Sequence, residues 1–461
     1  MHETKTLANF AASLQYDDLP GNVQSHSKRF ILDNLGCQIA GATLPWSKTY
    51  YDLLTETRSG RGGTVVHYGG QLAPDEAAFV NSTFNHANEI DDTHLKSPTH
   101  PGAVAVPAAL AMVEYAKGSG KDLITAVVAA YEIQIRIAWA VSPYLIEHGH
   151  HPPVGVGPFG AAAAGSIAMK LDPEQTLNAM AIAGSHSGGL IEYTRTGGSV
   201  KRIHCAIPAQ AGVRAALFAS RGITGPGTIL EGEKGFCKSF GRTYDLDRLT
   251  DRLGERYQML ENALKPHACC HLIHTAFDAF DEIKSKRALR ADKIKSILVT
   301  SNSKPILTHI GSIVEPKDIL GAQFSLPFSL ALRLERGSNG FWDYRDEDLK
   351  DPGLLAMARK VKVTAPDTGA WLNGMGVEIE FTDGSKDYAF VEFPKGSPEN
   401  PMSDAEVNAK FHAMVDPVTG SARAQAIIDT TWKLENMRNI ADLANLLVTQ
   451  PAAGARAPKR A

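Results

Sequence analysis

The chain of 461 residues is long enough for two or three domains, and its 43% hydrophobic and 21% charged residues are typical of a globular protein. A formal net charge of −3, from 47 Lys and Arg against 50 Asp and Glu, gives no indication of a nucleic-acid or membrane-surface partner. The N-terminus lacks a signal-peptide pattern, no stretch is long and apolar enough to predict a membrane span, and the five cysteines are irregularly spaced. We therefore expect a cytoplasmic protein without a disulfide framework.

Helical patterns dominate the first 265 residues. Apolar side chains recur on one face of residues 22–41, and helices are predicted over 102–120, 121–141, 157–172 and 176–189. The segment 121–141 is apolar around most of its circumference, which is typical of a helix buried among others. Ala and Gly are frequent in the last two, so we expect helix backbones to approach one another closely there.

The pattern then changes to that of a mixed domain. Residues 293–303 are rich in β-branched side chains, and residues 376–393 alternate around Asp383-Gly384, which predicts a β-hairpin. A helix is expected between these two segments. Residues 266–396 are therefore predicted to form a small α+β domain.

Helical pattern returns beyond the hairpin, where Ser403 and Glu406 have the spacing of a capping box. The tail, 450–461, is expected to be disordered. We predict a mainly α-helical protein. Its large all-helical domain is discontinuous, formed by residues 1–265 and 397–461, and the α+β domain is inserted within it.

A polar stretch directly before the helix predicted at 102–120 is the first candidate site. It contains Glu89, Asp91, Asp92, His94 and His100. A carboxylate or a histidine placed beside a packed helix can remove a proton from a carbon atom. The alternative interpretation is a solvated turn.

Two later segments supply cations. Lys201, Arg202 and His204 precede one apolar helix, and Lys265 begins a segment that leads into another helix, which carries His271. Cations at a helix N-terminus oppose the helix dipole and are better tolerated when an anion lies among them. Carboxylates and histidines combined with these cations suit a small polyanionic substrate, whose developing negative charge the cations would stabilise.

Two other chemistries have weaker support. The run "GVGPFG" (155–160) matches G-x-G-x-x-G, but the preceding "IEHGHHPPV" cannot be the central strand that a dinucleotide site requires, so we expect these glycines to shape a turn into the next helix. His148 and His151 have metal-ligand spacing, but two prolines follow at once and no helix is secure there.

Six segments, in this order, resemble the MmgE/PrpD family: "NHANEIDDTHLKSPTHPGAVAVPAAL", "HHPPVGVGPFGAAAAGSIAMKLD", "GSHSGGLIEY…VKRIH", "TGPGTILEGEKGF", "KPHACCHLIH" and "QFSLPFSLAL". The resemblance covers nearly the whole chain. Members include 2-methylcitrate dehydratases, cis-aconitate decarboxylases and iminodisuccinate epimerases. The resemblance implies a helical domain with an α+β lid, an active site between them, a homodimer, and no metal or organic cofactor.

The resemblance also implies the site residues. The family's D-x-D-D-T segment matches "EIDDT", its T-H-P histidine is His100, and its K-x-x-H segment gives Lys201 and His204. We expect five catalytic residues, which are Asp91, His100, His151, Lys201 and Lys265. We expect six further residues to bind the substrate, which are Glu89, Asp92, Thr93, Lys96, His204 and His271.

Two departures from the family pattern bear on the reaction. Decarboxylase-like members carry His where this chain has Cys270, and Tyr where it has Phe328. We therefore expect a lyase that removes water from a small hydroxy- or unsaturated polycarboxylate, with Asp91 or His100 as the base. An epimerase of an imino- or amino-dicarboxylate, a cis-aconitate-type decarboxylase and a non-catalytic binding protein are the alternatives.

Overall fold

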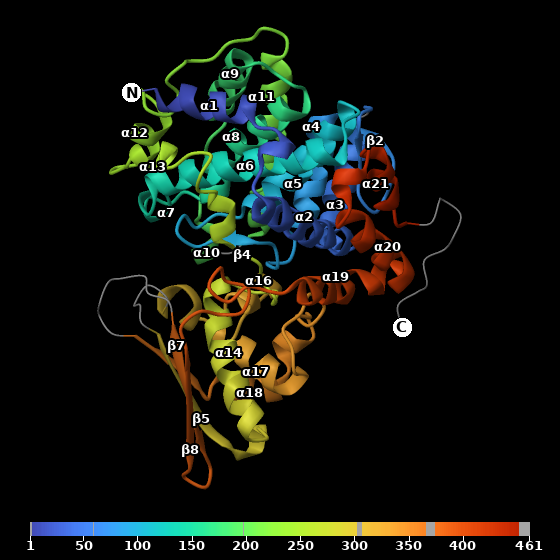
Figure 1. Ribbon diagram of the computed structural model, residues 1–461. Helices are drawn as coiled ribbons and strands as arrows, with labels where there is room; N and C mark the ends of the chain where they lie inside the picture. Colours follow the sequence, from blue (N-terminus) through green and yellow to red (C-terminus); the bar gives the residue numbers. More distant parts are fainter. Residues whose placement is uncertain (1, 59, 197, 302–306, 366–373, 451–461) are drawn as a thin grey trace. The chain divides into compact units, whose positions relative to one another are not determined.

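The computed structural model describes residues 2–58, 60–196, 198–301, 307–365 and 374–450. These residues form two compact units (Figure 1). The first unit comprises residues 1–87, 91–262 and 407–461, and the second comprises Asn88–Ile90 and residues 263–406. The tail predicted to be disordered lies outside the described residues, apart from Gln450.

The first unit is built almost entirely of helices, and the predicted mainly α-helical fold is confirmed. Its helices are α1 (Glu3–Ser13), α2 (Gly21–Ala42), α3 (Pro45–Thr57), α4 (Pro74–Asn85), α5 (Pro101–Tyr115), α6 (Gly120–Val141), α7 (Tyr144–Glu147), α8 (Pro152–Ala168), α9 (Pro173–Gly184), α10 (Tyr193–Thr196), α11 (Ala206–Ala219), α12 (Phe236–Phe240), α13 (Asp247–Thr250), most of α19 (Asp404–Thr419), α20 (Ser421–Thr431) and α21 (Ala441–Leu446). Short 3-10 turns are η1 (Tyr16–Asp18), η2 (Ser199–Ile203), η3 (Gln258–Glu261) and η7 (Leu434–Asn436). The strands β1 (Gly63–Thr64), β2 (Gln71–Leu72), β3 (Thr93–His94) and β4 (Asn262–Ala263) have two residues each.

Helix α8 lies at the centre of this unit, packed against α5, α6, α9 and α11. Small residues make the close packing feasible, because a Cβ on Gly212 of α11 would clash with the backbone of Pro158 in α8. The turn expected at 155–160 is wrong: these residues lie inside α8, which already begins at Pro152. Proline suits the first helical turn, where its missing N–H has no partner to lose.

Helix α6 begins at a capping box formed by Ser119 and Asp122. Among the described residues it is the one helix long and apolar enough to cross a membrane, but 94% of its apolar window is buried inside the protein. Its length and composition are therefore those of a core helix, as its all-round apolar pattern predicted.

The C-terminal segment contacts α2 of the first unit through two ion pairs. Lys410 of α19 forms an ion pair with Asp33, and Lys28 pairs with Glu435 at 2.6 Å. The capping box predicted at Ser403 and Glu406 is confirmed, with the Glu406 carboxylate accepting from the Ser403 N–H at 2.7 Å.

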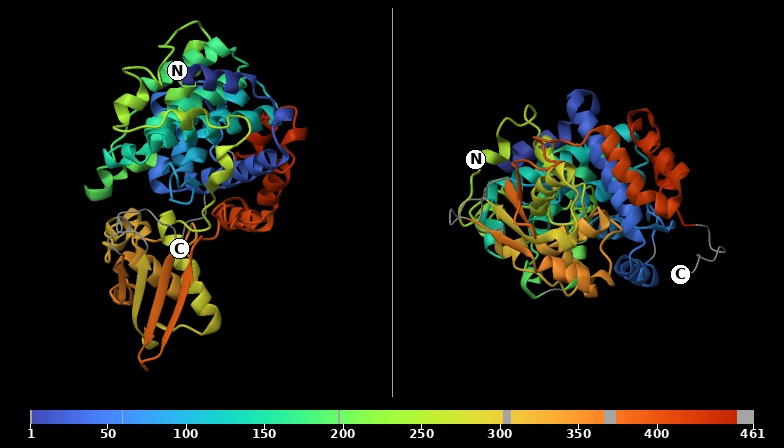
Figure 2. Two further views of the ribbon diagram at one scale, coloured as in Figure 1. Left: turned by 60° about the vertical axis from the view of Figure 1, so that its left-hand side comes forward. Right: turned by 90° about the horizontal axis from the view of Figure 1, so that it is seen from below.

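The second unit contains the larger sheet, in the order β6-β5-β7-β8. Its strands are β5 (Ile294–Ser301), β6 (Val361–Thr364), β7 (Met375–Phe381) and β8 (Lys386–Val391), and its helices are α14 (His271–Lys286), α16 (Ile319–Gln323), α17 (Leu326–Arg336) and α18 (Pro352–Ala358), with short turns η4 (Ala291–Lys293), η5 (Leu307–Gly311) and η6 (Asp348–Lys350). Strand β6 is parallel to β5, whereas the other pairs are antiparallel. Helix α14 packs on β7 and β8, and both views of Figure 2 show it beside the sheet.

The predicted hairpin is confirmed as β7 and β8. Gly384 adopts a φ of +86° in its turn, a conformation that glycine reaches without steric cost.

Candidate active site

The ends of three helices, a connecting segment and a short turn of the first unit carry the residues of the candidate site. His86 immediately follows α4, His100 immediately precedes α5, and His151 immediately precedes α8. Asp91 lies in the segment between α4 and α5, and Lys201 lies in η2. Because α4 packs against α5 and η2, and α5 packs against α8, the helix ends bring these side chains together.

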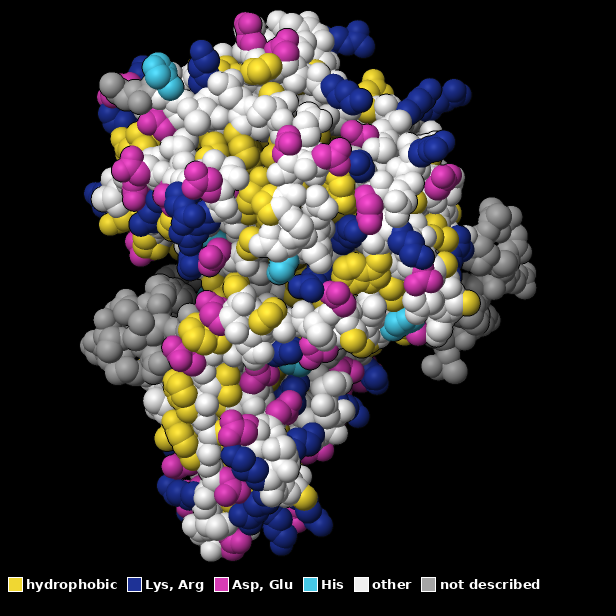
Figure 3. Space-filling view, in the orientation of Figure 1, with side chains coloured by type: hydrophobic (Ala, Val, Ile, Leu, Met, Phe, Trp, Pro, Cys, Tyr) yellow, Lys and Arg dark blue, Asp and Glu magenta, His cyan; other side chains and the backbone are white. Residues whose placement is uncertain are grey.

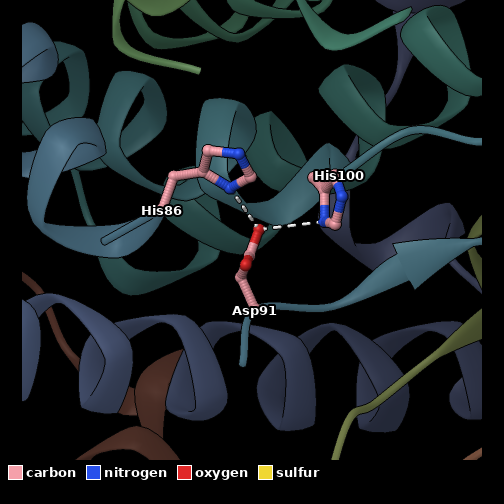
Figure 4. Close-up of side chains that lie close together, drawn as sticks. All are labelled: His86, Asp91 and His100. Atoms are coloured by element: carbon pink, nitrogen blue, oxygen red, sulfur yellow. Dashed lines mark hydrogen bonds and ion pairs between the residues drawn. The ribbon is translucent and has the colours of Figure 1, made fainter. Parts of the chain in front are cut away.

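Asp91 is the centre of the cluster (Figure 4). Its Oδ2 lies 2.8 Å from Nδ1 of His86 and 3.1 Å from Nδ1 of His100, and its side chain is fully buried. Nδ1 of His100 also lies 3.1 Å from the backbone oxygen of Asp92. Both neighbours of this nitrogen are acceptors, so His100 carries its proton on Nδ1 and presents the lone pair of Nε2.

Lys201 fixes the tautomer of the second histidine. Lys201 is buried, with only 3% of the residue exposed, and its ammonium donates to Nε2 of His86 at 3.2 Å. His86 therefore accepts at Nε2 and donates from Nδ1 to Asp91. The result is a chain of hydrogen bonds that runs from Lys201 through His86 and Asp91 to His100.

The same three side chains, His86, Asp91 and His100, are close enough together to suggest a metal site. A metal ligand must offer a lone pair, yet the Nδ1 atoms that face Asp91 carry protons in the arrangement just described. The Lys201 ammonium beside His86 is a further cost to a bound cation. The donor set therefore fits a proton relay better than a metal centre.

A second group of rings adjoins the first. Nδ1 of His151 lies 3.0 Å from Nδ1 of His204, and the His151 ring centroid is 6.4 Å from that of His100 and 6.2 Å from that of His86. Tyr193, which is nearly buried, packs edge-on against His151 and His204, with centroids 5.5 and 5.4 Å away. The site is thus walled by aromatic rings on this side.

Asp92 points into a different environment. Its carboxylate accepts from Asn34 Nδ2 at 3.1 Å, from the Tyr131 hydroxyl at 2.8 Å and from Asn262. Gly102 makes room for this network, because a Cβ there would lie 2.5 Å from the Tyr131 hydroxyl oxygen. Asp92 therefore anchors the segment that carries Asp91 and His100.

Burial and charge set the protonation states. Burial, followed by the Lys201 ammonium, lowers the pKa of His86 to about 4, and burial lowers that of His204 to about 4. Burial and then Lys201 also lower the pKa of His151 well below its usual value. Burial acts to raise the pKa of Asp91, but the two histidines outweigh it and hold that pKa well below normal. The imidazoles of His86, His151 and His204 are therefore neutral at pH 7, and Asp91 is charged.

Several predicted residues lie outside this cluster. Lys96 is exposed and pairs with Glu261 at 2.7 Å, and the Thr93 hydroxyl donates to the backbone of Thr99 at 3.2 Å. His94, from the same polar stretch, is buried with Nδ1 2.7 Å from the Ser97 hydroxyl.

The second unit holds the remaining predicted residues. The Lys265 ammonium donates to the backbone oxygen of Glu89 at 3.0 Å and lies 3.7 Å from its carboxylate. His271 begins α14, with its ring 5.0 Å from that of His274. Cys270 and Phe328, the two departures from the family pattern, are buried. The roles of Lys265, Glu89 and His271 stay predictions.

Two residues of the cluster were missed from the sequence. His86 is not among the residues expected from the sequence; the signal is its position five residues before Asp91 and directly after a helix. Tyr193 has no motif around it that marks a site, and only its stacking in the fold reveals it.

Comparison with known proteins identifies the family of the chain. Residues 5–249 match the MmgE/PrpD N-terminal domain and residues 267–435 match the MmgE/PrpD C-terminal domain. A cis-aconitate decarboxylase of Aspergillus terreus is 30% identical over 96% of this chain and 95% of its own length. A cis-aconitate decarboxylase-like protein of Aspergillus oryzae is 28% identical (96% and 97%), and the cis-aconitate decarboxylase of Mus musculus is 27% identical (96% and 93%).

Proposed function

Since the chain belongs to the MmgE/PrpD family, we propose that it is a lyase that acts on a small polycarboxylate without a cofactor. The observation that carries the proposal is the hydrogen-bonded chain Lys201–His86–Asp91–His100. It combines a buried cation with an oriented imidazole, which is what a carbon acid that bears carboxylates requires.

Lys201 supplies the cation. A substrate carboxylate that enters beside its ammonium forms a charge-assisted hydrogen bond in a site of low polarity, where such bonds are strong. Negative charge that develops on the substrate as a bond to carbon breaks is stabilised by the same ammonium.

His100 moves the proton. Asp91 orients its ring and stabilises the imidazolium form, as a carboxylate does for a catalytic histidine elsewhere. Nε2 of His100 then exchanges a proton with a substrate carbon. The second carboxylate oxygen of Asp91, Oδ1, is buried and accepts no hydrogen bond from the described residues.

The first candidate reaction is decarboxylation of an acid of the cis-aconitate type. Relatives with this activity in their names align with nearly the whole chain. The bond between a carbon atom and its carboxyl group breaks and carbon dioxide leaves. The electron pair delocalises into the neighbouring unsaturated carboxylate, and a proton that Nε2 of His100 has first taken from solvent then bonds to carbon.

The second candidate is dehydration of a hydroxy acid, which the departures at Cys270 and Phe328 favour. Here His100 takes the proton from carbon and passes it to the hydroxyl group, which leaves as water while the electron pair of the C–H bond forms the new double bond. Both reactions pass through negative charge next to a carboxylate, so they use Lys201 in the same way.

One experiment separates these reactions. The purified protein is incubated in heavy water with a panel of di- and tricarboxylic acids, and the products are analysed by mass spectrometry. Decarboxylation replaces carbon dioxide with one deuterium, whereas dehydration removes water. Epimerisation introduces deuterium without loss of mass from the carbon skeleton. Tight binding of an acid without turnover would contradict the lyase assignment and support a binding protein.

Variants connect the reaction to the site. His100→Gln keeps a polar side chain but cannot shuttle a proton, so turnover should fall sharply. Lys96→Ala is the matched control from the same segment, because Lys96 is exposed and paired with Glu261. Lys265→Met tests the predicted role of Lys265. Full activity in His100→Gln would remove it as the proton carrier.

A further inference from the structure

Arg202 is a cation of the predicted site segment that has no part in the proposed reaction. Figure 3 shows Lys and Arg side chains spread over the surface among Asp and Glu. Arg202 is partly buried, and its Cζ lies over the ring of Trp46, 3.5 Å from the ring centroid. The face of an indole attracts a guanidinium in this position. The ring therefore holds a side chain that is otherwise long and flexible.

The backbone oxygen of Ala87 receives two hydrogen bonds at this place. The Arg202 guanidinium donates to it from Nη1, and the Trp46 indole donates to it from Nε1 at 3.2 Å. Ala87 lies directly after His86, just beyond the end of α4. A cation is favourable at this end of a helix, because the helix dipole places partial negative charge there. Arg202 and Trp46 therefore fix the residue that follows His86.

Two consecutive residues of η2 thus bind two consecutive residues at the end of α4. The Lys201 ammonium donates to Nε2 of His86 at 3.2 Å, and Arg202 donates to the oxygen of Ala87. Neighbouring Cα atoms are only about 3.8 Å apart, so a shift of Ala87 away from Arg202 also changes the distance between Lys201 and His86. Without Arg202, this distance would depend on one bond from a flexible lysine side chain.

We propose that Arg202 is a positioning residue, which together with Trp46 fixes the distance between the Lys201 ammonium and the His86 imidazole. It acts through Lys201 and not on the substrate. The catalytic consequence rests on the proposed function, because it requires that Lys201 stabilises charge on the substrate. The geometry itself is measurable in the protein without substrate.

The pKa of His86 reports this geometry. Burial, followed by the Lys201 ammonium, lowers that pKa to about 4, and Asp91 opposes the shift. Loss of Arg202 reaches the imidazole through displacement of Lys201, so the pKa of His86 should rise. An arginine that only stabilised the fold would leave this pKa unchanged as long as the protein stayed folded.

A double-variant cycle tests the proposal. NMR titration of the histidine rings compares the unmodified chain with Arg202→Met, Lys201→Met and the variant that carries both changes. Arg202→Met should raise the pKa of His86, as Lys201→Met does, and should lower kcat/KM by about tenfold, as expected for a misplaced catalytic group. In the Lys201→Met background it should add little to either quantity, because the cation through which it acts is already gone.

Arg214→Met is the matched control, because Arg214 binds the opposite end of α4. Its Nε and Nη2 donate to Oδ2 of Asp75 at 3.0 and 2.6 Å. Asp75 lies in the first turn of α4, about 16 Å along the helix axis from His86. The control should leave the pKa of His86 and kcat/KM unchanged. A general loosening of α4 is thereby separated from the local effect of Arg202.

Substitutions of Trp46 give an independent result if Arg202→Met folds poorly, as judged by circular dichroism. Trp46→Phe keeps an aromatic face under the guanidinium and loses only the indole N–H, whereas Trp46→Leu loses both. Trp46→Leu should raise the pKa of His86 part of the way to its value in Lys201→Met. Trp46→Phe should restore most of the difference, because the stacking of Arg202 is kept.

The outcomes distinguish this inference from the proposed function. A folded Arg202→Met variant with an unchanged His86 pKa would overturn the positioning role, and so would fully additive losses of kcat/KM from Arg202→Met and Lys201→Met. Absence of turnover in the unmodified chain would contradict the proposed function instead. The titrations would still decide whether Arg202 sets the distance between Lys201 and His86.

Discussion

Asp91 and Asp92 are adjacent in the chain, but they lie in opposite environments. Asp91 faces two imidazoles that hold its pKa well below normal, so it stays charged. Burial, followed by the charge of Asp91, raises the pKa of Asp92 to about 6, and its partners are amides and a hydroxyl. Asp91 therefore orients histidines, whereas Asp92 holds the segment in place.

The largest effect is expected from Asp91→Asn. The substitution keeps the shape but removes the negative charge that orients both histidines and stabilises an imidazolium. Turnover should fall by about 10³- to 10⁴-fold, as for loss of the carboxylate beside a catalytic histidine. Steady-state kinetics measure the loss, and thermal unfolding should change little.

Asp92→Asn is the matched comparison for that variant. An amide offers one acceptor oxygen where the carboxylate offers two, so hydrogen bonds to the neighbouring donors are lost. We expect a stability loss of about 2 kcal/mol with a much smaller effect on turnover. If Asp92→Asn abolishes turnover and Asp91→Asn only destabilises, the assigned roles are reversed.

Lys201→Met should have the next largest effect on catalysis. It removes the cation proposed to hold substrate carboxylates, and kcat/KM should fall by about 10²-fold or more. Because Lys201 lowers the pKa of His86, the pKa of this imidazole should rise above about 4 in the variant. NMR titration of the histidine rings measures the shift. An unchanged His86 pKa would mean that the two groups do not interact in solution.

Gly102→Ala should damage the Asp92 region without touching the Asp91 cluster directly. The added methyl group meets Asp92, Asn34 and Tyr131, and overpacking of this kind costs about 3 kcal/mol. Gly21→Ala is the control, because nothing lies within 4 Å of its Cβ at the start of α2. Denaturant unfolding compares the two. Equal stability of both variants would contradict the tight packing around Asp92.

The smallest expected effect is the change in the free energy of unfolding with pH. His86 and His204 have folded pKa values of about 4 against 6.5 when unfolded, so below pH 6.5 the unfolded chain binds protons that the folded chain does not. Stability should therefore fall as pH drops from 6.5 to 4, by at most about 1.4 kcal/mol per pH unit for each histidine.

Asp92 opposes this trend over part of the range. Its raised pKa means that the folded chain binds a proton between pH 6 and 3.8 that the unfolded chain lacks, which adds stability as pH falls. Asp92→Asn should therefore steepen the decline. Urea unfolding at several pH values measures both slopes, and a flat profile for the unmodified chain would contradict the neutral, buried state of the histidines.

The sequence was informative where residue type and order decide the structure. Helical periodicity predicted the mainly α-helical fold, and the Asp383-Gly384 turn predicted the hairpin of β7 and β8. For the site, motif resemblance chose His100, His151, Lys201 and His204, and the structure brings these side chains together with Asp91 in one unit.

Side-chain direction was not predictable from the sequence. Nothing in "EIDDT" separates Asp91, which faces the histidines, from Asp92, which faces Asn34 and Tyr131. Lys96 and Lys201 are both lysines beside polar motifs, but one is exposed and the other is buried. Such differences depend on tertiary packing, which local pattern does not encode.

The assignment of Asn88–Ile90 to the second unit has a mechanical consequence. Gln323 bonds to the oxygen atoms of Asn88 at 2.9 and 3.1 Å, Asn88 donates to Phe341 at 2.8 Å, and Lys265 donates to Glu89. Three residues span at most about 10 Å of extended chain. This segment is covalently joined to Ala87 on one side and Asp91 on the other, so the backbone that carries the carboxylate orienting His100 continues directly into residues held by the second unit.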